Sequence, residues 1–458
     1  MPLLKRKSES RKTVERPYIR DAWQPLDGPA DFATVAAVMI VLALVIGFAV
    51  GFLVFLVMNL SMWLSALLWN AGGLWDMGQT GNAGGTPTGL AWFPLVVCTI
   101  GGVIIGVWTH VSGNRVQPLE KVMEQFRQTG SYDLGGAGKA TVSFLLPLVF
   151  GGSIGFEAGL TGLITAGCCW IRDKLKAAGL REAAVADVTI AASIAAIFGT
   201  PLAGIVAGAE SSPEDAVDVD DYNMRKSVKL VLYTAAAFGA FAGISAFSAL
   251  FGTTSGFPRF DAIAASGTEY LWALLALAFS YLLAILYHTA SIATNGIANG
   301  LSTLFGQGAA TTVLKPTIAG IVIGFLAMFF PYVLFPGETQ SHELMQTWTS
   351  WTAVALIMTG LLKAIATPTC INLGWVGGNF CPSIFAGAAC GYGLSLITGA
   401  DPMLMVTVVT TGFLAGVTRK PVLSIAILML CFPAQDIIWM GLAAIIVSVL
   451  PVPQRSSE

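Results

Sequence analysis

The sequence predicts an all-α polytopic membrane protein made of two inverted-topology repeats of tilted and broken helices. Charged residues make up only 11% of the 458 residues, whereas a soluble domain carries about a quarter, and the mean hydropathy is +0.74. Apolar segments recur along the whole chain, and several are interrupted by Gly and Pro at corresponding places in the two halves. This composition excludes a soluble globular protein.

The apolar segments define one membrane domain. They lie at residues 33–69, 91–109, 143–170, 185–209, 228–251, 268–288, 313–335, 350–370, 383–400 and 402–452. The first far exceeds the roughly 20 residues that cross a bilayer core. Broken helices are tolerated in a membrane only where protein or a watery cavity covers their free backbone groups. We predict a single domain at 33–452, with halves of about 33–225 and 226–452, and a short tail at 453–458.

Basic residues indicate the orientation in the membrane. Residues 1–32 carry seven Lys or Arg against five acidic residues and no apolar core, so they are typical of a cytoplasmic tail and not of a signal peptide. A second basic cluster follows an apolar segment and is also expected in the cytoplasm by the positive-inside rule; it comprises Arg172, Lys174, Lys176 and Arg181. Both termini are expected in the cytoplasm, and both basic regions are either solvated flanks or lipid-binding segments.

Cysteine and histidine give no support to a disulfide framework, a metal site or a cofactor. The seven cysteines are odd in number and lie in apolar or Gly-rich surroundings, so they are interpreted as packing residues. The three histidines are far apart and lack ligand spacing. They are His110, His288 and His342.

Two pairs of interrupted segments suggest an internal repeat. The stretch Gly151 to Glu157 resembles Val376 to Pro382, and the stretch 195–202 resembles 415–422. The offsets nearly agree, because 380 − 157 is 223 and 421 − 201 is 220. A near-constant offset is typical of a repeat, and paired breaks in two halves indicate a binding site near the membrane midplane.

Glu157 is the only charged residue between Ala140 and Ile171, and it lies where a Gly-rich break meets a new helix. A mid-bilayer acid costs about 2.5 to 3.5 kcal/mol, so such acids usually have a function. Desolvation raises a carboxyl pKa, which would let this group exchange a proton near neutral pH. The alternative is a structural acid paired with a buried base such as Lys363.

The second break places Asn379 and Phe380 in the first turn of a helix. Backbone N–H groups there lack intrahelical partners, and the macrodipole adds partial positive charge, so this end favours an anion without a cationic side chain. Gly155, Gly377 and Gly378 allow the backbone to come close to such an ion. The alternative interpretation is a tight turn with Pro near a helix start.

Three motifs in this order resemble the CLC family of chloride channels and proton/chloride exchangers. They are Gly155-Phe156-Glu157-Ala158-Gly159, Thr200-Pro201-Leu202-Ala203-Gly204-Ile205 and Gly378-Asn379-Phe380-Cys381-Pro382. The resemblance covers about residues 33–450 and implies a homodimer with one pore in each inverted-repeat subunit. It also implies that Glu157 is the gate and proton acceptor. The anion-binding residues would be Gly155, Phe156, Gly378, Asn379 and Phe380.

The chain departs from the family pattern at several places. Phe156 replaces an arginine, which resembles a bacterial branch of the family. The family's pore serine has only a loose counterpart around Asn114, to which its role is not transferred, and its pore tyrosine has no match. The internal proton-relay position is Ser211, so the adjacent Glu210 is either a possible proton path or an ordinary helix-end carboxylate.

These residues and the family resemblance predict transport of a small inorganic anion, with chloride as the expected substrate. The protein would act as a proton/chloride antiporter or as a chloride channel. The expected location is a bacterial plasma membrane. Another halide or nitrate, such as fluoride, is an alternative substrate. Partners are the anion, protons and membrane lipid, with no nucleic acid. An inverted-repeat transporter of a cation or organic substrate is the alternative from another class, although more acidic or aromatic groups would be expected in its spans. No enzyme motif is present in the apolar segments, so no enzyme is expected.

Overall fold

The computed structural model describes most of the predicted membrane domain. The described residues are 32–70, 75–76, 88–89, 91–113, 137–157, 159–160, 162, 164, 184–211, 226–253, 256–429 and 431–453. The basic tail, the basic cluster around Lys174, the residue Asn114 and the tail after residue 453 lie outside the described residues, as does most of the two polar loops.

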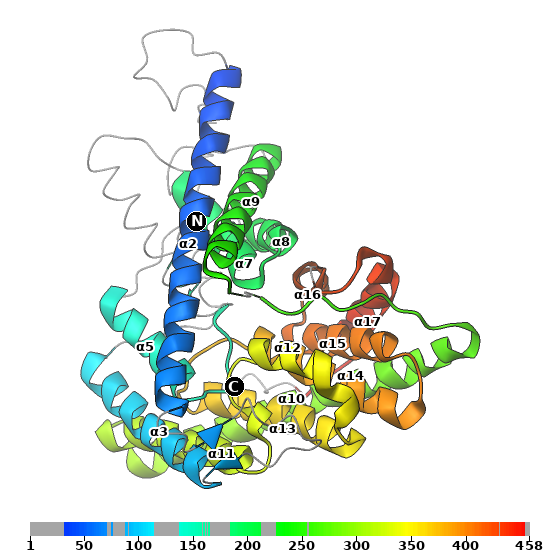
Figure 1. Ribbon diagram of the computed structural model, residues 1–458. Coiled ribbons are helices and arrows are strands. Elements are labelled where there is room, and N and C mark those ends of the chain that lie inside the picture. Colours follow the sequence, from blue (N-terminus) through cyan, green and yellow to red (C-terminus); the bar gives the residue numbers. More distant parts are fainter. Residues whose placement is uncertain are drawn as a thin grey trace, which may run out of the picture.

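The described chain is almost entirely helical (Figure 1). Its strands are a single antiparallel pair of two residues each, β1 Trp75–Asp76 and β2 Thr88–Gly89. The described residues also form four short 3₁₀ helices, η2 Gly267–Leu271, η3 Pro331–Val333, η4 Trp348–Ser350 and η5 Ala434–Asp436. The α-helices are α2 Phe32–Trp69, α3 Phe93–Ser112, α5 Ala137–Val149, α7 Ala184–Phe198, α8 Pro201–Ser211, α9 Lys226–Phe251, α10 Trp272–Phe305, α11 Ala309–Ala327, α12 Glu338–Thr347, α13 Ala353–Asn372, α14 Phe380–Thr398, α15 Pro402–Thr418, α16 Pro421–Leu428 and α17 Ile437–Val449.

Among the described residues, seven helical stretches are long and apolar enough to cross a bilayer, which confirms the multi-span prediction. α14 is the most enclosed of them, because 89% of its most apolar window is buried inside the protein. The stretches are Ala37–Trp69, Phe93–Ser112, Lys229–Phe251, Gly267–Phe305, Ala309–Ala327, Ala353–Asn372 and Phe380–Thr398.

Small residues bring long helices into close contact. α2 and α9 lie side by side (Figure 1), and a Cβ at Gly47 or Gly51 would overlap the carbonyl of Ala236 or Ala240. α3 and α11 pack in the same way through Gly102, Gly106, Gly320 and Gly324. Each of these helices places its glycines four residues apart, which is the spacing that lets membrane helices approach to backbone contact.

The chain breaks recur at the two offsets found in the sequence. Gly151 and Gly374 take positive φ angles of 86° and 100°, and 374 − 151 is 223. Gly199 and Arg419 take φ angles of 65° and 58°, and 419 − 199 is 220. Each break ends one helix and precedes the next, so both halves are interrupted at matching positions. Arg419 holds this conformation although glycine usually occupies it, and its guanidinium donates to the carbonyl of Leu450 at 2.8 Å.

Three differences from the expected segments concern α10, α12 and the segment at 185–209. The apolar segment at 268–288 continues as helix to Phe305. Polar side chains in this second half bond to carbonyls of the preceding turn, as Asn295 Nδ2 does to Ser291 O at 3.0 Å. α12 is too polar to appear among the apolar segments, and it packs beside α14. The segment at 185–209 is two helices, because Gly199 interrupts it.

Candidate functional site

The two Gly-rich breaks meet in space. Gly155 N–H donates to the carbonyl of Gly378 at 2.8 Å, and Gly378 N–H donates to the carbonyl of Gly155 at 3.0 Å, so the pair forms an isolated antiparallel bridge. A Cβ on either residue would overlap the carboxyl group of Glu157. Glycine at both positions therefore leaves the space that this carboxyl occupies, and a larger residue would displace it.

Glu157 lies against the start of α14. Its side chain is fully buried, its Oε1 accepts the N–H of Phe380 at 2.6 Å, and the Cys381 thiol lies 3.4 Å from its Oε2. The Phe380 N–H is one of the donors that a helix leaves without an intrahelical partner. The carboxylate thus occupies the place where this helix end would hold an anion.

The structure brings together the residues singled out in both motifs. Gly155, Phe156 and Glu157 come from the first half, and Gly378, Asn379 and Phe380 come from the second. The surroundings are apolar: Phe156 is 5% exposed, and the rings of Phe198 and Phe380 lie 5.6 Å apart. Water is largely excluded from the Glu157 side of the site.

Asn379 faces a residue that the sequence analysis missed. Its side chain does not cap α14; its Nδ2 lies 3.4 Å from the hydroxyl of Tyr287 on α10. Cys381 was likewise not predicted to contact Glu157. No sequence pattern gives these contacts, since they depend on how α10 and α14 pack.

Lys363 does not pair with Glu157, which removes the alternative of a buried acid–base pair between them. The Lys363 ammonium is fully buried and donates to four consecutive backbone carbonyls, those of Tyr332, Val333, Leu334 and Phe335, at 2.9, 3.3, 3.0 and 2.9 Å. It also lies 4.8 Å from the centroid of the Phe385 ring.

The four carbonyls that Lys363 contacts belong to residues 332–335, and this segment is hydrogen-bonded to the first Gly-rich break. Phe335 N–H donates to the carbonyl of Gly151 at 3.2 Å, and Ser153 Oγ lies 3.3 Å from the hydroxyl of Thr367 on α13. The turn that precedes Glu157 is therefore held from both the 332–335 segment and α13.

Glu210 is not part of this cluster in the described contacts. It lies at the end of α8, where its carboxylate is 3.4 Å from the Lys420 ammonium, with both side chains about one third exposed. α8 begins at Pro201, so at 1.5 Å per residue Glu210 lies about 13 Å along the helix from that end. The side chain of Ser211 lies outside the described residues.

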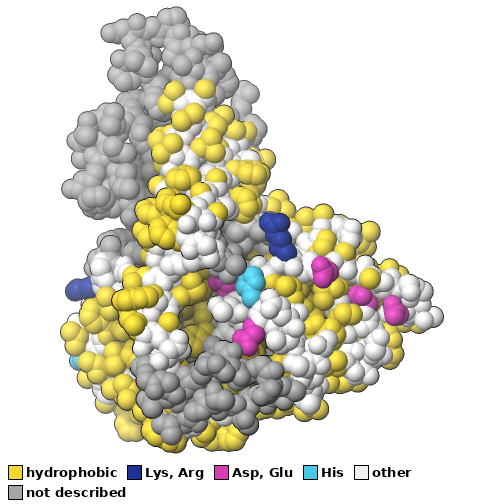
Figure 2. All heavy atoms as spheres, in the orientation of Figure 1, with side chains coloured by type: hydrophobic (Ala, Val, Ile, Leu, Met, Phe, Trp, Pro, Cys, Tyr) yellow, Lys and Arg dark blue, Asp and Glu magenta, His cyan; other side chains and the backbone are white. Residues whose placement is uncertain are grey.

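A second group of titratable residues lies on α12. Glu338 accepts the backbone N–H of Gly256, and His342 Nε2 lies 3.0 Å from the carbonyl of the same residue. Burial raises the pKa of Glu338 to about 7, although the bond from Gly256 opposes the shift. Figure 2 shows acidic side chains and a histidine over this part of a face that is otherwise largely uncharged. Within the described residues no group of three or more His, Cys, Asp or Glu is arranged to hold a metal ion.

The sequence profile of the voltage gated chloride channel family matches residues 97–451, which is most of the chain. The chain belongs to this family, known as CLC. Its members are channels and transporters, so the predictions of a CLC resemblance and of no enzymatic activity are confirmed. Membership also leaves the alternative of a cation or organic-substrate transporter without support.

Two curated CLC relatives match over part of their length. The chain is 33% identical over 82 residues to the chloride channel protein CLC-f of Arabidopsis thaliana and 34% identical over 119 residues to a putative chloride channel protein, ClcB-like, of Ralstonia nicotianae. These matches cover 17% and 24% of this chain. They span only 10% and 27% of the two relatives.

Solved structures match over nearly the whole chain and confirm the fold. A CLC-type fluoride/proton antiporter has a TM-score of 0.63 at 15% identity, covering 91% of this chain and 96% of that chain. A slow cyanobacterial Cl⁻/H⁺ antiporter has a TM-score of 0.64 at 18% identity, covering 90% and 93%. A eukaryotic CLC transporter has a TM-score of 0.61 at 18% identity, covering 90% and 72%.

Proposed function

We propose that this CLC protein moves chloride across the membrane through a pathway gated by Glu157. The observation that carries the proposal is the 2.6 Å bond from the Phe380 N–H to the Glu157 carboxylate. A carboxylate bonded there competes with an anion for the same donor. The site opens when the carboxylate is protonated or moves away.

The donors suit conduction because they bind an anion without holding it too tightly. The Phe380 N–H and the start of α14 supply partial positive charge, and the nearby Lys363 ammonium is occupied by backbone carbonyls. A full cationic charge in contact with the anion would slow its release. Gly155 and Gly378 leave room for the ion only once the Glu157 carboxyl has left.

Glu157 also couples the anion to a proton in the antiporter form of this proposal. When the Glu157 carboxylate is protonated, it leaves the Phe380 N–H free for the anion. When it is deprotonated, it binds this N–H again, so the anion and the carboxylate occupy the site in alternation. Glu210 is proposed as the possible internal proton path, and its ion pair with Lys420 is the contact that would regulate it. In the channel form Glu157 acts as a gate without net proton transfer.

Fluoride is the alternative substrate, because one of the similar folds is that of a fluoride/proton antiporter. We further propose a homodimer in the bacterial plasma membrane, with both termini in the cytoplasm. Its organisation would be the tail 1–32, the transport domain 33–452 with halves of about 33–225 and 226–452, and the tail 453–458.

The test is simultaneous anion and proton flux in proteoliposomes for the parent protein, Glu157→Gln and Glu157→Ala. We expect both variants to conduct chloride while proton movement driven by a chloride gradient disappears. Glu269→Gln is the matched control, since Glu269 is a partly exposed carboxylate that accepts the N–H of Ser266 at a helix start, and it should behave as the parent. Loss of all flux in folded Glu157 variants would refute the gate. A fluoride flux far above the chloride flux would replace the proposed substrate.

A further inference from the structure

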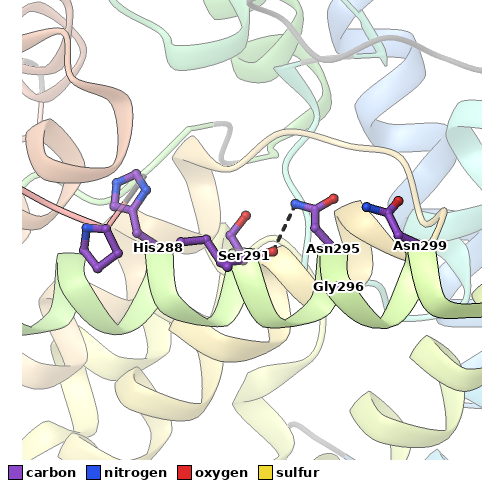
Figure 3. Close-up of a pocket in the computed structure, with 7 residues that line it drawn as sticks. His288, Ser291, Asn295, Gly296 and Asn299 are labelled. Atoms are coloured by element: carbon purple, nitrogen blue, oxygen red, sulfur yellow. Dashed lines mark hydrogen bonds between the residues drawn. The ribbon is translucent and has the colours of Figure 1, made fainter. Parts of the chain in front are cut away.

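A polar groove runs along the second half of α10. Figure 3 shows His288, Ser291, Asn295 and Asn299 on the same side of the helix, as expected from spacings of three, four and four residues. The groove has a volume of about 380 Å³, and Ile292, Gly296 and Pro453 complete its lining. A row of four polar residues is unusual on a helix of this apolar composition, so its role calls for an explanation.

Hydrogen bonds link this part of α10 to the start of α14 and the end of α13. Tyr287 precedes His288 in the sequence, and its hydroxyl lies 3.4 Å from Asn379 Nδ2. Asn379 in turn precedes Phe380, whose N–H binds Glu157. A second link lies beside it, because Asn372 Nδ2 donates to the Ser291 carbonyl at 3.0 Å and to the Thr294 hydroxyl at 2.8 Å. Polar contacts therefore connect the groove to the α13–α14 break at two points.

The lining offers hydrogen-bond donors that an anion can use. Amide, hydroxyl and imidazole groups line the groove, and no carboxylate is among its seven lining residues. Arg419 lies close enough to His288 to act on it electrostatically. A positive charge near neutral hydrogen-bond donors raises the local anion concentration.

The far wall of the groove is fixed in place over α10. Tyr281 on α10 donates its hydroxyl to the carbonyl of Pro451 at 2.6 Å, and Arg419 donates to the carbonyl of Leu450 at 2.8 Å. Two anchors thus hold the segment that ends at Pro453. His288 is oriented by the Gly416 carbonyl, 3.0 Å from its Nε2.

We propose that the α10 groove is an anion vestibule, through which the transported ion reaches the site at Glu157 and Phe380. The inference rests on the proposed function and adds to it the residues of one access route. Asn295 and Ser291 would hydrate or briefly bind the ion, and the Tyr287 hydroxyl and Asn379 amide would pass it to the Phe380 N–H.

The experiment uses the full chain in proteoliposomes with single cysteine substitutions and two thiol reagents, the anionic MTSES and the cationic MTSET. Asn295→Cys is the test variant. Ile297→Cys is the matched control, since Ile297 is exposed on the same helix and lies about 200° around it from Asn295. The five described native cysteines are all buried, and the parent protein treated with each reagent measures any background reaction.

The measured quantity is the ratio of the MTSES reaction rate to the MTSET reaction rate. We expect this ratio to be about tenfold higher for Asn295→Cys than for a small free thiol. Modification by MTSES should also suppress chloride flux. Ile297→Cys should keep parental flux after either reagent. Asn299→Cys, at the open end of the groove, gives the same test if Asn295→Cys fails to fold. Parental flux after complete modification of either groove variant, or no reaction with MTSES, would overturn the vestibule alone. A parent without anion flux would overturn the proposed function together with it.

Discussion

Replacing Lys363 with methionine tests whether this residue holds the site together. Methionine keeps most of the volume of the side chain but cannot donate to the carbonyls of Tyr332, Val333, Leu334 and Phe335. The bonds to Tyr332, Val333 and Leu334 are buried and the bond to Phe335 is partly buried, so water poorly replaces the lost donor.

The expected cost follows from the number of acceptors left without a donor. The Leu334 carbonyl keeps a second donor, the Gln340 side-chain amide at 3.2 Å, so Lys363→Met affects the other three most strongly. Each such carbonyl costs about 1 to 3 kcal/mol when it is left without a donor. With three carbonyls affected, we expect a loss of at least about 3 kcal/mol in the free energy of unfolding.

The assay is reversible unfolding in mixed detergent micelles, followed by tryptophan fluorescence. Lys420→Met is the matched control, because Lys420 pairs with Glu210 where both side chains are about one third exposed. Such a surface pair contributes at most about 1 kcal/mol. A Lys363→Met cost no larger than that of the control would refute the role assigned to the four carbonyls.

Three further substitutions have defined outcomes. Gly378→Ala should displace the Glu157 carboxyl from its amide donor and make chloride flux independent of pH. Gly441→Ala is the control, because a Cβ there meets no other atom, and it should keep the parental pH profile. An unchanged pH profile in both variants would contradict the geometry. The pKa of Glu338 is raised from 4.5 to about 7, so the folded state binds its proton more tightly than the unfolded chain. Its stabilising contribution is present at low pH and is lost as the pH rises from 4.5 to about 7, and Glu338→Gln should flatten this part of the stability curve measured by thermal unfolding. Gly106→Ile would overlap the α11 backbone and should cost about 1 to 3 kcal/mol in the same unfolding assay, and a parental value would show that α3 and α11 are not closely packed.

The core of the site could be predicted because its signals are local. An isolated acid in an apolar stretch and two Gly-rich breaks at matching offsets single out Glu157, Gly155 and Gly378. The structure then places all three in contact. Whether Glu157 gates the pathway stays a prediction.

The missed parts have no local signal. The bond between Asn379 and Tyr287 depends on helix packing, and sequence reasoning offered Glu157 as a partner for Lys363, whereas the structure gives Lys363 backbone carbonyls. Every residue has a backbone carbonyl, so the sequence does not show which carbonyls a buried lysine contacts. Such a lysine is therefore easily interpreted as one partner of an ion pair. α12 was missed because its polar composition gives no apolar pattern.

The reciprocal bonds between Gly155 and Gly378 join residues synthesised far apart in time. A ribosome completes the first half of the chain well before the second, and until then Glu157 has no Phe380 amide to meet. Contacts of such sequence separation form late and carry the full entropic cost of closing the loop between them. A chain truncated before Gly378 would therefore lack both this bridge and the Phe380 N–H donor to Glu157.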